Sequence, residues 1–247
     1  KRQIFLLSTL FLKFSDERTG NPMDLENKAL DYDLTLKRKR IMIYFIEATE
    51  KLLRRDGIEN LTIRGIATEA GYNSATIYNY FNDLDQLIMF GSLCYLRDYV
   101  AELEAKLKPD MRAIEQYRTA YHCFNKHALD DPEIYHHIFF GKYRDQLSSV
   151  LDLYYHVLFP NELDHLSKEM QNMLVQGSMT ERDKAMIERM VEEKDLRADK
   201  AQITSDLVVA LHQNFLYEAS LKRQGYDRAA HEEEFNREFE YLLAAGR

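Results

Sequence analysis

The sequence predicts an all-α protein in which a small helical unit precedes a larger helical bundle. The 247 residues include only nine glycines and four prolines, the residues least compatible with helix interiors. Long stretches repeat apolar residues every three to four positions, which is the period of an amphipathic helix. A chain of this length buries a sizeable core without disulfides or metal ions. The predicted parts are an N-terminal extension at 1–36, the small unit at 37–82 and the bundle at 83–247.

Charge is distributed unevenly between these parts. The formal net charge is −8, which by itself argues against a nucleic-acid-binding protein. Residues 37–82 nevertheless contain eight Lys and Arg against five acidic residues, a balance of +3. Five basic and six acidic residues in 1–36 then leave −10 for residues 83–247. A basic segment joined to an acidic body predicts a phosphate-binding module attached to a domain with a different partner.

The two cysteines and the N-terminal segment bear on the cellular compartment. Cys94 and Cys123 are too few for a disulfide framework, which favours reduced thiols in a cytoplasmic protein. The apolar run at 4–14 is too short to span a bilayer. Met23 opens a segment that reads like a natural start. We therefore expect residues 1–22 to be an upstream extension or a weak amphipathic arm and not a functional domain.

Helix boundaries follow from caps and helix breakers. The small unit is expected to hold helices at about 36–55, at 63–70 and from 74 to near Phe81. Gly57 ends the first helix, Thr62 caps the second, Gly71 supplies a positive-φ turn, and Asn73 or Ser74 caps the third. A long helix from 84 to about 108 follows. The remaining helices are predicted at 111–129, 132–142, 143–159, 162–176, 180–195, 199–223 and 227–244.

Two short helices joined through Gly71 form a helix-turn-helix pattern, in which small Ala67 and Ala70 let the helices cross closely. The segments LTIRGIATEAG at 61–71, NSATIYNYF at 73–81 and DLDQL at 83–87 resemble the DNA-binding domain of the TetR family of bacterial regulators. The resemblance covers about a fifth of the chain. It implies that the second short helix is a recognition helix that lies in the major groove of DNA.

The uncharged face of that helix suits this role, because short polar groups reach phosphates and base edges without steric hindrance. Thr62, Ser74, Thr76, Tyr78 and Tyr80 are expected to contact the DNA backbone. Asn73, Ala75 and Asn79 are the candidate base readers, and Arg64 is suited to a guanine edge or a phosphate. Additional phosphate contacts are expected from an N-terminal arm that comprises Lys37, Arg38, Lys39 and Arg40. The alternative is a plain helical hairpin whose polar side chains face water.

Two positions depart from the family pattern. Ser74 and Leu84 occupy places where the family commonly has Lys, so fewer counterions are released when DNA binds. The basic run at 37–40 is expected to compensate.

The resemblance also implies that residues 83–247 bind a small effector and dimerise. Aromatic and polar residues in the middle helices suit a bundle cavity for an apolar ligand, although an ordinary aromatic core is the competing interpretation. The candidate effector-binding residues are Tyr95, Tyr99, Tyr117, Tyr121, His122, Phe124, Phe139, Tyr143 and Tyr155. The candidate dimer-interface residues are Met186, Met190, Leu207, Leu211 and Phe215, for which an intramolecular core is the alternative.

A histidine cluster raises the question of a metal site. His122, Cys123 and His127 are spaced one and five positions apart, which does not define one helix face, and His136 and His137 point in different directions. We therefore predict no metal site and no cofactor.

Taken together, these features predict a cytoplasmic, ligand-responsive regulator of transcription. Most consistent with the resemblance is a homodimeric repressor that binds a palindromic DNA operator and is released by a small apolar or aromatic effector. A DNA-binding adaptor or architectural protein without an effector is the first alternative. An all-helical metal-dependent enzyme is less consistent, because the sequence lacks a phosphate-binding Gly loop, a nucleophile elbow and paired Glu-x-x-His motifs. We predict no enzymatic activity and no membrane association.

Overall fold

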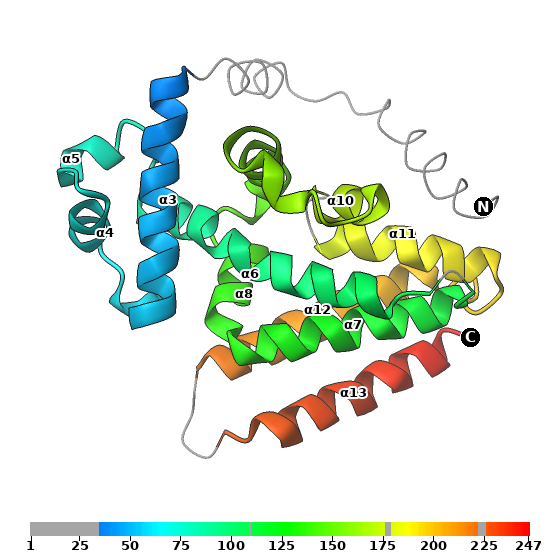
Figure 1. Ribbon diagram of the computed structural model, residues 1–247. Coiled ribbons are helices and arrows are strands. Elements are labelled where there is room, and N and C mark those ends of the chain that lie inside the picture. Colours follow the sequence, from blue (N-terminus) through cyan, green and yellow to red (C-terminus); the bar gives the residue numbers. More distant parts are fainter. Residues whose placement is uncertain (1–34, 109, 176–178, 222–225) are drawn as a thin grey trace.

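The computed structural model describes residues 35–247 except 109, 176–178 and 222–225 (Figure 1). Its described residues form helices, turns and loops without a strand, as the sequence predicts. The expectations for residues 1–22 lie outside the described residues. Within the described part, no helix is both long and apolar enough to cross a membrane.

The N-terminal unit consists of α3 (Leu36–Asp56), α4 (Ile63–Ala70) and α5 (Ser74–Ile77). The Thr35 side chain accepts a hydrogen bond from the backbone N–H of Arg38 at the start of α3. Gly57, at φ 78°, ends α3 as predicted. Aromatic and branched apolar side chains from the three helices and from the chain after α5 fill the centre of the unit, and they are Phe45, Ile46, Ile66, Ile77 and Phe81.

Helix α5 is shorter than the sequence predicts. It ends at Ile77 instead of continuing to near Phe81, and residues 78–80 form a turn. The Phe81 ring is buried and packs edge-on against Phe45 and Phe90, with centroid distances of 6.4 and 5.5 Å. The tertiary contact therefore sets the path of the chain beyond α5 and overrides local helix propensity.

Helix α6 (Leu84–Lys106) leaves the N-terminal unit and runs through the middle of the molecule (Figure 1). It crosses α3 where Gly91 faces Thr49. A Cβ atom on Gly91 would lie 2.6 Å from Cγ2 of Thr49, so the two helices approach too closely for any larger residue. Thr49 is fully buried and donates its hydroxyl to the carbonyl oxygen of Phe45 at 2.7 Å, which holds its side chain in place.

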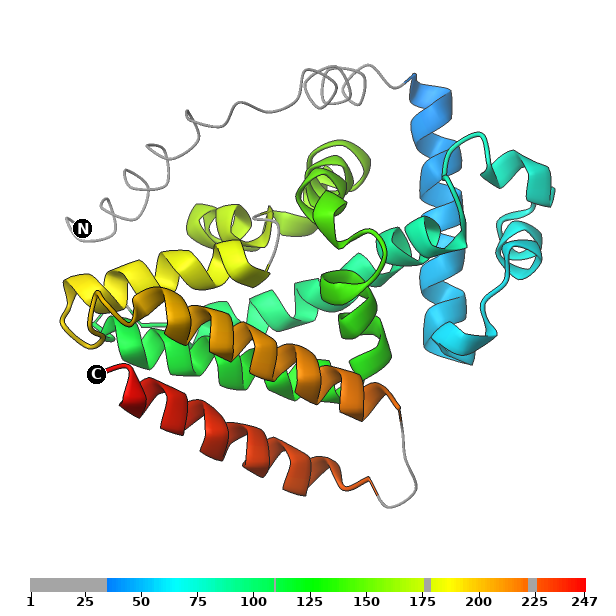
Figure 2. The same cartoon turned by 180° about the vertical axis from the view of Figure 1, so that it is seen from behind.

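The remaining helices form the bundle. They are α7 (Ala113–Asp130), α8 (Pro132–Phe140), α9 (Leu147–Asp152), α10 (Lys168–Val175), α11 (Met179–Glu192), α12 (Ala201–Ser220) and α13 (Arg228–Ala245). Of these, α7, α8 and α10 contact α6 directly. Helix α12 packs against α7, α8, α11 and α13. Figure 2 shows α12 and α13 side by side on one face of the bundle.

The predicted helices at 143–159 and 162–176 are interrupted in the structure. The first divides into a 3₁₀ turn (Arg144–Gln146), α9 and a π-helical turn (Leu153–Leu158). The second divides into a 3₁₀ turn (Pro160–Leu163) and α10. Core contacts explain the π-helical turn, since Tyr154 packs on Phe159 at 4.5 Å and Tyr155 donates its hydroxyl to the Leu93 carbonyl at 3.1 Å.

The close crossing of α3 and α6 predicts the effect of Gly91→Ala. In an open helix this change stabilises by about 1 kcal/mol because glycine is a poor helix former. Here the new methyl group would displace buried Thr49, so we expect a net loss of about 1 kcal/mol or more in the free energy of unfolding. Urea unfolding measures the change. Ser92→Ala, which removes a buried hydroxyl without a hydrogen-bond partner, is the adjacent control and should be neutral or stabilising. A stabilised Gly91→Ala variant would contradict this account of the crossing.

Candidate functional site

The turn between α4 and α5 has the geometry that its residues predict. Gly71 adopts a left-handed conformation with φ 77° and ψ 27°. Thr62 Oγ1 accepts a hydrogen bond from the Gly65 N–H at 3.0 Å, which caps α4. Because Thr62 acts here as an acceptor, its hydroxyl hydrogen remains available to donate. Ala67 is buried and Ala70 half-buried where the two helices meet.

Asn73, and not Ser74, caps α5. Its Oδ1 atom accepts from both the backbone N–H and the hydroxyl of Thr76, each at 3.0 Å. Only the amide N–H groups of Asn73 then remain for a further contact, so a bidentate contact with adenine would require opening the cap. Asn79 is exposed, and its side chain forms no hydrogen bond within the described residues. It therefore keeps both its donor and its acceptor for a base edge.

The outer side of α5 and the following turn is exposed and without charge. Ala75, Tyr78 and Asn79 are exposed, and Tyr78 keeps 59 % of its surface. Ser74, Thr76 and Tyr80 are partly exposed. This surface presents hydroxyl, amide and methyl groups on a short helix at the end of the molecule opposite to the bundle (Figure 1).

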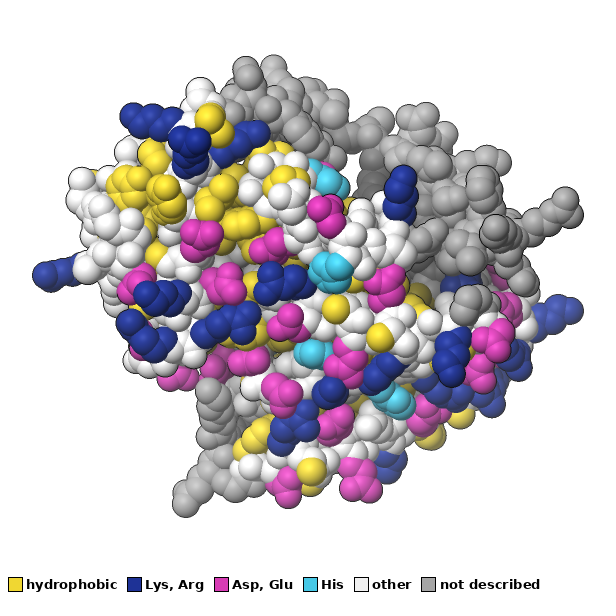
Figure 3. Space-filling model, in the orientation of Figure 1, with side chains coloured by type: hydrophobic (Ala, Val, Ile, Leu, Met, Phe, Trp, Pro, Cys, Tyr) yellow, Lys and Arg dark blue, Asp and Glu magenta, His cyan; other side chains and the backbone are white. Residues whose placement is uncertain are grey.

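Lys37, Arg38, Lys39 and Arg40 lie in the first turns of α3 and do not form a separate arm. We refer to these four residues as the α3 cation cluster. The Arg38 guanidinium lies over the Tyr80 ring, 4.8 Å from its centroid, which joins the cluster to the chain after α5. Figure 3 shows Lys and Arg side chains gathered at this end of the molecule, beside the apolar side chains of the same unit.

The α3 cation cluster differs from the other cations of the N-terminal unit in its ion pairs. Lys51 and Arg55 pair with Glu69, and Arg54 pairs with Glu50 at 3.3 Å. Among the described residues, no carboxylate pairs with the four cluster residues or with Arg64. Cations at a helix N-terminus oppose the helix dipole, at a cost of about 0.3–1 kcal/mol each, and the first turn of α3 holds no acid. A cationic surface without a carboxylate partner in the described part of the chain therefore lies beside a polar helix, where an anion such as a phosphate could bind.

Asp83 connects this unit to the bundle. It caps α6 by accepting from the Gln86 N–H at 2.9 Å, and it also accepts from the Tyr143 hydroxyl at 2.9 Å and from Lys142. Burial raises the pKa of Asp83, but these hydrogen bonds outweigh burial and lower it overall. Tyr143, a candidate effector residue, thus lies at the base of the N-terminal unit.

A buried polar cluster occupies the centre of the bundle. Asp183 of α11 accepts hydrogen bonds from the hydroxyls of Tyr117 and Tyr121 at 2.5 and 2.7 Å, and from Ser205 of α12. Asp183 is only 2 % exposed. Burial raises its pKa, although the three hydroxyl donors act in the opposite direction. The carboxyl group is thus held deep in an aromatic environment by neutral donors.

His212 of α12 completes this core polar cluster. It is fully buried, and neither ring nitrogen has a hydrogen-bond partner within the described residues. Its ring packs against Phe124, Phe235 and Tyr121, with centroid distances of 4.7, 5.3 and 5.8 Å. Burial lowers its pKa to about 3, so the imidazole is neutral at physiological pH and offers one donor and one acceptor. An unsatisfied buried donor or acceptor costs about 1–3 kcal/mol.

The structure brings together only part of the predicted effector residues. Tyr117, Tyr121 and Phe124 belong to the surroundings of the core polar cluster, and Tyr99 and Phe139 contact Phe124 at 5.2 and 5.3 Å.

The other candidates lie elsewhere. Tyr95 lies under the Arg54 guanidinium at 5.0 Å, Tyr155 bonds to the α6 backbone, and His122 is exposed. Asp183, Ser205 and His212 were not predicted from the sequence. One sequence feature could have revealed Asp183. It lies on the same helix face as Ile187 and Met190, where an apolar residue is expected.

Some of the residues predicted to form the dimer interface are exposed, and others are buried. Leu207 is 46 % exposed, and Leu211 and Met186 are partly exposed. Met190 and Phe215 face the interior of the protomer and are buried there. A partner subunit would therefore not reach Met190 or Phe215 without rearrangement of the bundle.

The buried His212 predicts a pH dependence of stability. A histidine in the unfolded chain binds a proton below about pH 6.5, whereas folded His212 stays neutral down to about pH 3. Protonation of this residue in the unfolded chain therefore lowers the free energy of unfolding as the pH falls below 6.5. At pH 5 the loss is about 2 kcal/mol. His212→Leu should remove this decrease, as measured by urea unfolding at pH 7 and pH 5. Exposed His165, changed to Gln, is the control. An unchanged pH dependence in His212→Leu would contradict the assignment.

Comparisons with known proteins agree with the geometry of the N-terminal unit. Residues 45–88 match the model of the bacterial regulatory proteins of the tetR family. The HTH-type transcriptional regulator SAB2452 of Staphylococcus aureus (strain bovine RF122 / ET3-1) is 24 % identical over 140 residues, which cover 54 % of this chain and 75 % of that protein.

Two solved structures share the overall fold. RolR in complex with the ligand resorcinol has a TM-score of 0.54 at 15 % identity, over 85 % of this chain and 89 % of RolR. FadR of Thermus thermophilus, a TetR-family repressor in complex with lauroyl-CoA, has a TM-score of 0.52 at 15 % identity, over 83 % of this chain and 94 % of FadR. Residues 45–88 thus carry the N-terminal helix-turn-helix unit of the tetR family of bacterial regulatory proteins, and most of the chain shares the fold of these two solved structures.

Proposed function

We propose that this regulator represses transcription as a homodimer bound to a palindromic DNA operator, and that a small effector in the bundle releases it. The observation that carries the proposal is the uncharged, hydrogen-bonding face of α5 beside the unpaired α3 cation cluster. In this proposal residues 37–82 form the DNA-binding domain and residues 83–247 the effector and dimerisation domain, in a cytoplasmic protein.

We assign the proposed DNA contacts to polar, methyl and cationic groups that the fold of the N-terminal unit leaves exposed. Asn79 and Ala75 read base edges in the major groove, whereas Thr62, Tyr78 and the α3 cation cluster contact phosphates. Ser74 and Leu84 contribute no cation, so the cluster supplies most of the charge. Two subunits then place their α5 helices one DNA turn apart, roughly 34–36 Å.

The exposed apolar face of α12 supports the dimer. Ile203, Leu207 and Tyr217 on α12, with Leu221 directly after it, keep between 39 and 58 % of their surface. Tyr241 on neighbouring α13 is 73 % exposed. Figure 2 shows that these two helices form one face of the bundle. Packing of this face on a second copy would bury the apolar stripe in a four-helix interface.

The core polar cluster supports the effector site. Aromatic rings surround Asp183 and His212, which suits a small apolar or aromatic body. Asp183 favours a ligand that carries a hydroxyl or amine donor, and neutral His212 accepts or donates one further bond. The fold neighbours RolR and FadR were solved in complex with resorcinol and with lauroyl-CoA, respectively, which supports the proposal of a small-molecule site in the bundle.

Helix α6 supplies the proposed connection between the two sites. It begins at Asp83 beside the DNA-binding unit, and its Tyr99 packs on Phe124 next to the core polar cluster. An effector that binds better to a conformation with displaced α6 shifts the population away from the DNA-binding state.

Replacing all four residues of the α3 cation cluster with Ala should weaken operator binding more than Ser74→Ala. Each lost phosphate contact lowers the slope of log K against log salt by roughly 0.9, whereas Ser74→Ala removes no charge and should leave the slope unchanged. Loss of cations from the N-terminus of α3 does not destabilise the helix. Fluorescence anisotropy at several salt concentrations measures both quantities, and a footprint at low salt should show a protected palindrome.

The control replaces exposed Lys108, Lys168, Lys184 and Arg237 with Ala, which removes the same charge away from the DNA-binding unit. Equal slopes in the cluster and control variants would show that the cluster does not contact phosphates. A footprint without a palindrome would contradict the homodimeric operator complex.

Asp183→Asn should impair the response to effector. In a thermal-shift screen we expect stabilisation by phenols or amines and none by matched carboxylic acids, which Asp183 would repel. The same compounds should release operator DNA. Asp183→Asn keeps the shape but replaces one acceptor oxygen with a donor NH2 group and removes the charge, and it should weaken the response more than tenfold, or about 1.4 kcal/mol. Asp206→Asn, an exposed change on α12, is the control. If no compound class stabilises the protein, the adaptor function without an effector is favoured instead.

A further inference from the structure

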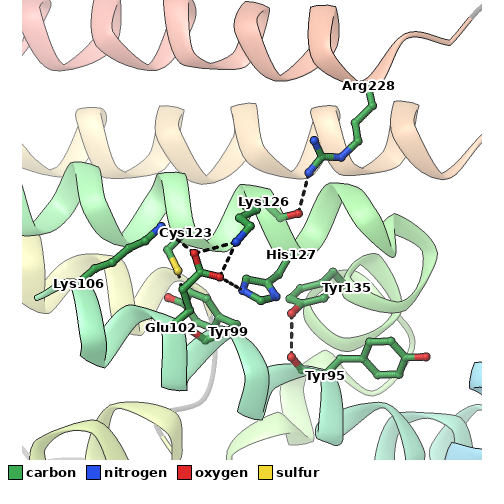
Figure 4. Close-up of polar contacts among 9 residues, drawn as sticks. All are labelled: Tyr95, Tyr99, Glu102, Lys106, Cys123, Lys126, His127, Tyr135 and Arg228. Atoms are coloured by element: carbon green, nitrogen blue, oxygen red, sulfur yellow. Dashed lines mark hydrogen bonds and ion pairs between the residues drawn. The ribbon is translucent and has the colours of Figure 1, made fainter.

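A second cluster of ligand-type side chains lies between α6 and α7, outside the core polar cluster. Glu102 projects from α6, and Cys123 and His127 project from α7 (Figure 4). Cys123 and His127 are four residues apart, which places them on the same face of the helix. One donor atom from each residue, a carboxylate oxygen, the thiol sulfur and an imidazole nitrogen, lies within 4.8 Å of the other two.

The present contacts of these atoms show a carboxylate that is neutralised by several donors. Glu102 accepts from Lys106 at 2.7 Å and from Lys126 at 2.8 Å, and His127 Nε2 lies 2.8 Å from it. These hydrogen bonds lower the pKa of Glu102 to about 2, so the group is ionised at neutral pH. The Cys123 thiol lies 3.8 Å from the carbonyl oxygen of Tyr99, to which it donates a weak hydrogen bond.

This donor set matches a borderline-soft divalent ion. Thiolate sulfur, imidazole nitrogen and carboxylate oxygen are the ligands that Zn²⁺ takes in proteins, at about 2.0–2.3 Å. Tetrahedral ligands at that radius lie about 3.6 Å apart, so the three side chains would need to close by roughly 1 Å. Glu102 and His127 keep 21 and 22 % of their side-chain surface, which leaves an entry path from solvent.

We propose that Glu102, Cys123 and His127 bind one Zn²⁺ ion, with water as the fourth ligand. The two lysines withdraw from Glu102 when the ion binds, since their side chains are 46 and 54 % exposed and reach water. The Cys123 S–H bond breaks, the sulfur bonds to the ion, and the proton passes to solvent. No oxidant or reductant is needed.

Proton release makes the affinity dependent on pH. Binding replaces the Cys123 S–H bond with a sulfur–metal bond and releases one proton. Zn²⁺ binding should therefore tighten as the pH rises. The ion would also link α6 to α7 near Tyr99, whose ring contacts both His127 and Phe124.

The test uses the full, untagged chain freed of metal and reduced. Zn²⁺ affinity is measured by competition with a chromophoric chelator, and Co²⁺ substitution reports ligand type by its sulfur-to-metal charge-transfer band. We expect one ion per chain, the charge-transfer band, and a higher melting temperature with Zn²⁺. Cys123→Ala should abolish the band. Glu102→Gln and His127→Ala should each weaken binding by at least the roughly 10–100-fold that loss of an outer-shell partner costs.

Matched controls are Cys94→Ala, which removes the other buried thiol, and His122→Ala on the exposed side of α7. Both should keep the band and the affinity. Lys126→Gln retains all three ligands and removes a competing ammonium group, so it should bind Zn²⁺ more tightly even if a ligand variant fails to fold. Failure of the wild-type chain to bind Zn²⁺, a band that survives Cys123→Ala, or weaker binding by Lys126→Gln would overturn the proposal.

Discussion

The close crossing of α3 and α6 at Thr49 and Gly91 is the constraint on which the two-part architecture depends. It seats the DNA-binding unit directly on the helix that runs through the bundle. The Asp83 contacts with Gln86, Lys142 and Tyr143 fix the same junction from the side of the bundle. Because packed helices have few alternative arrangements, a displacement of α6 moves the DNA-binding unit as one body. In the proposed mechanism, the effector therefore acts on DNA binding through this junction.

At the two sites where function is proposed, the residues depart from the usual preferences for charge at helix ends and for hydrogen-bonded polar groups in the core. The α3 cation cluster opposes the helix dipole, and His212 has no hydrogen-bond partner in its aromatic core among the residues that the structure describes. Several helix starts carry side-chain caps, as at Thr62, Asn73 and Asp83, whereas α12 begins after Lys200 without one. Natural sequences tend to be locally consistent except at functional sites. The deviations thus point to an anion beside α5 and to a polar ligand inside the bundle.

The candidate site was predictable from the sequence only where neighbouring residues define it. The capped turn from Thr62 through Gly71 to Asn73 was read correctly, because caps and turns depend on local chemistry. Side chains that meet from distant helices were not predicted. Asp183 joins Tyr117 and Tyr121 across more than sixty residues, and Glu102 meets Cys123 and His127 from another helix. The four-residue spacing between Cys123 and His127 was overlooked because His122 was considered together with them.

The sequence by itself determined the helical class, the helix-turn-helix unit and its family, since periodicity, caps and a contiguous motif are local properties. Only the tertiary structure decided where α5 ends, how 143–176 is interrupted, and which aromatic residues surround polar groups. Those outcomes depend on long-range packing of rings such as Phe81 and Tyr155. An amphipathic helix shows that it has a buried face, but the partners of that face come from packing between helices that are distant in sequence.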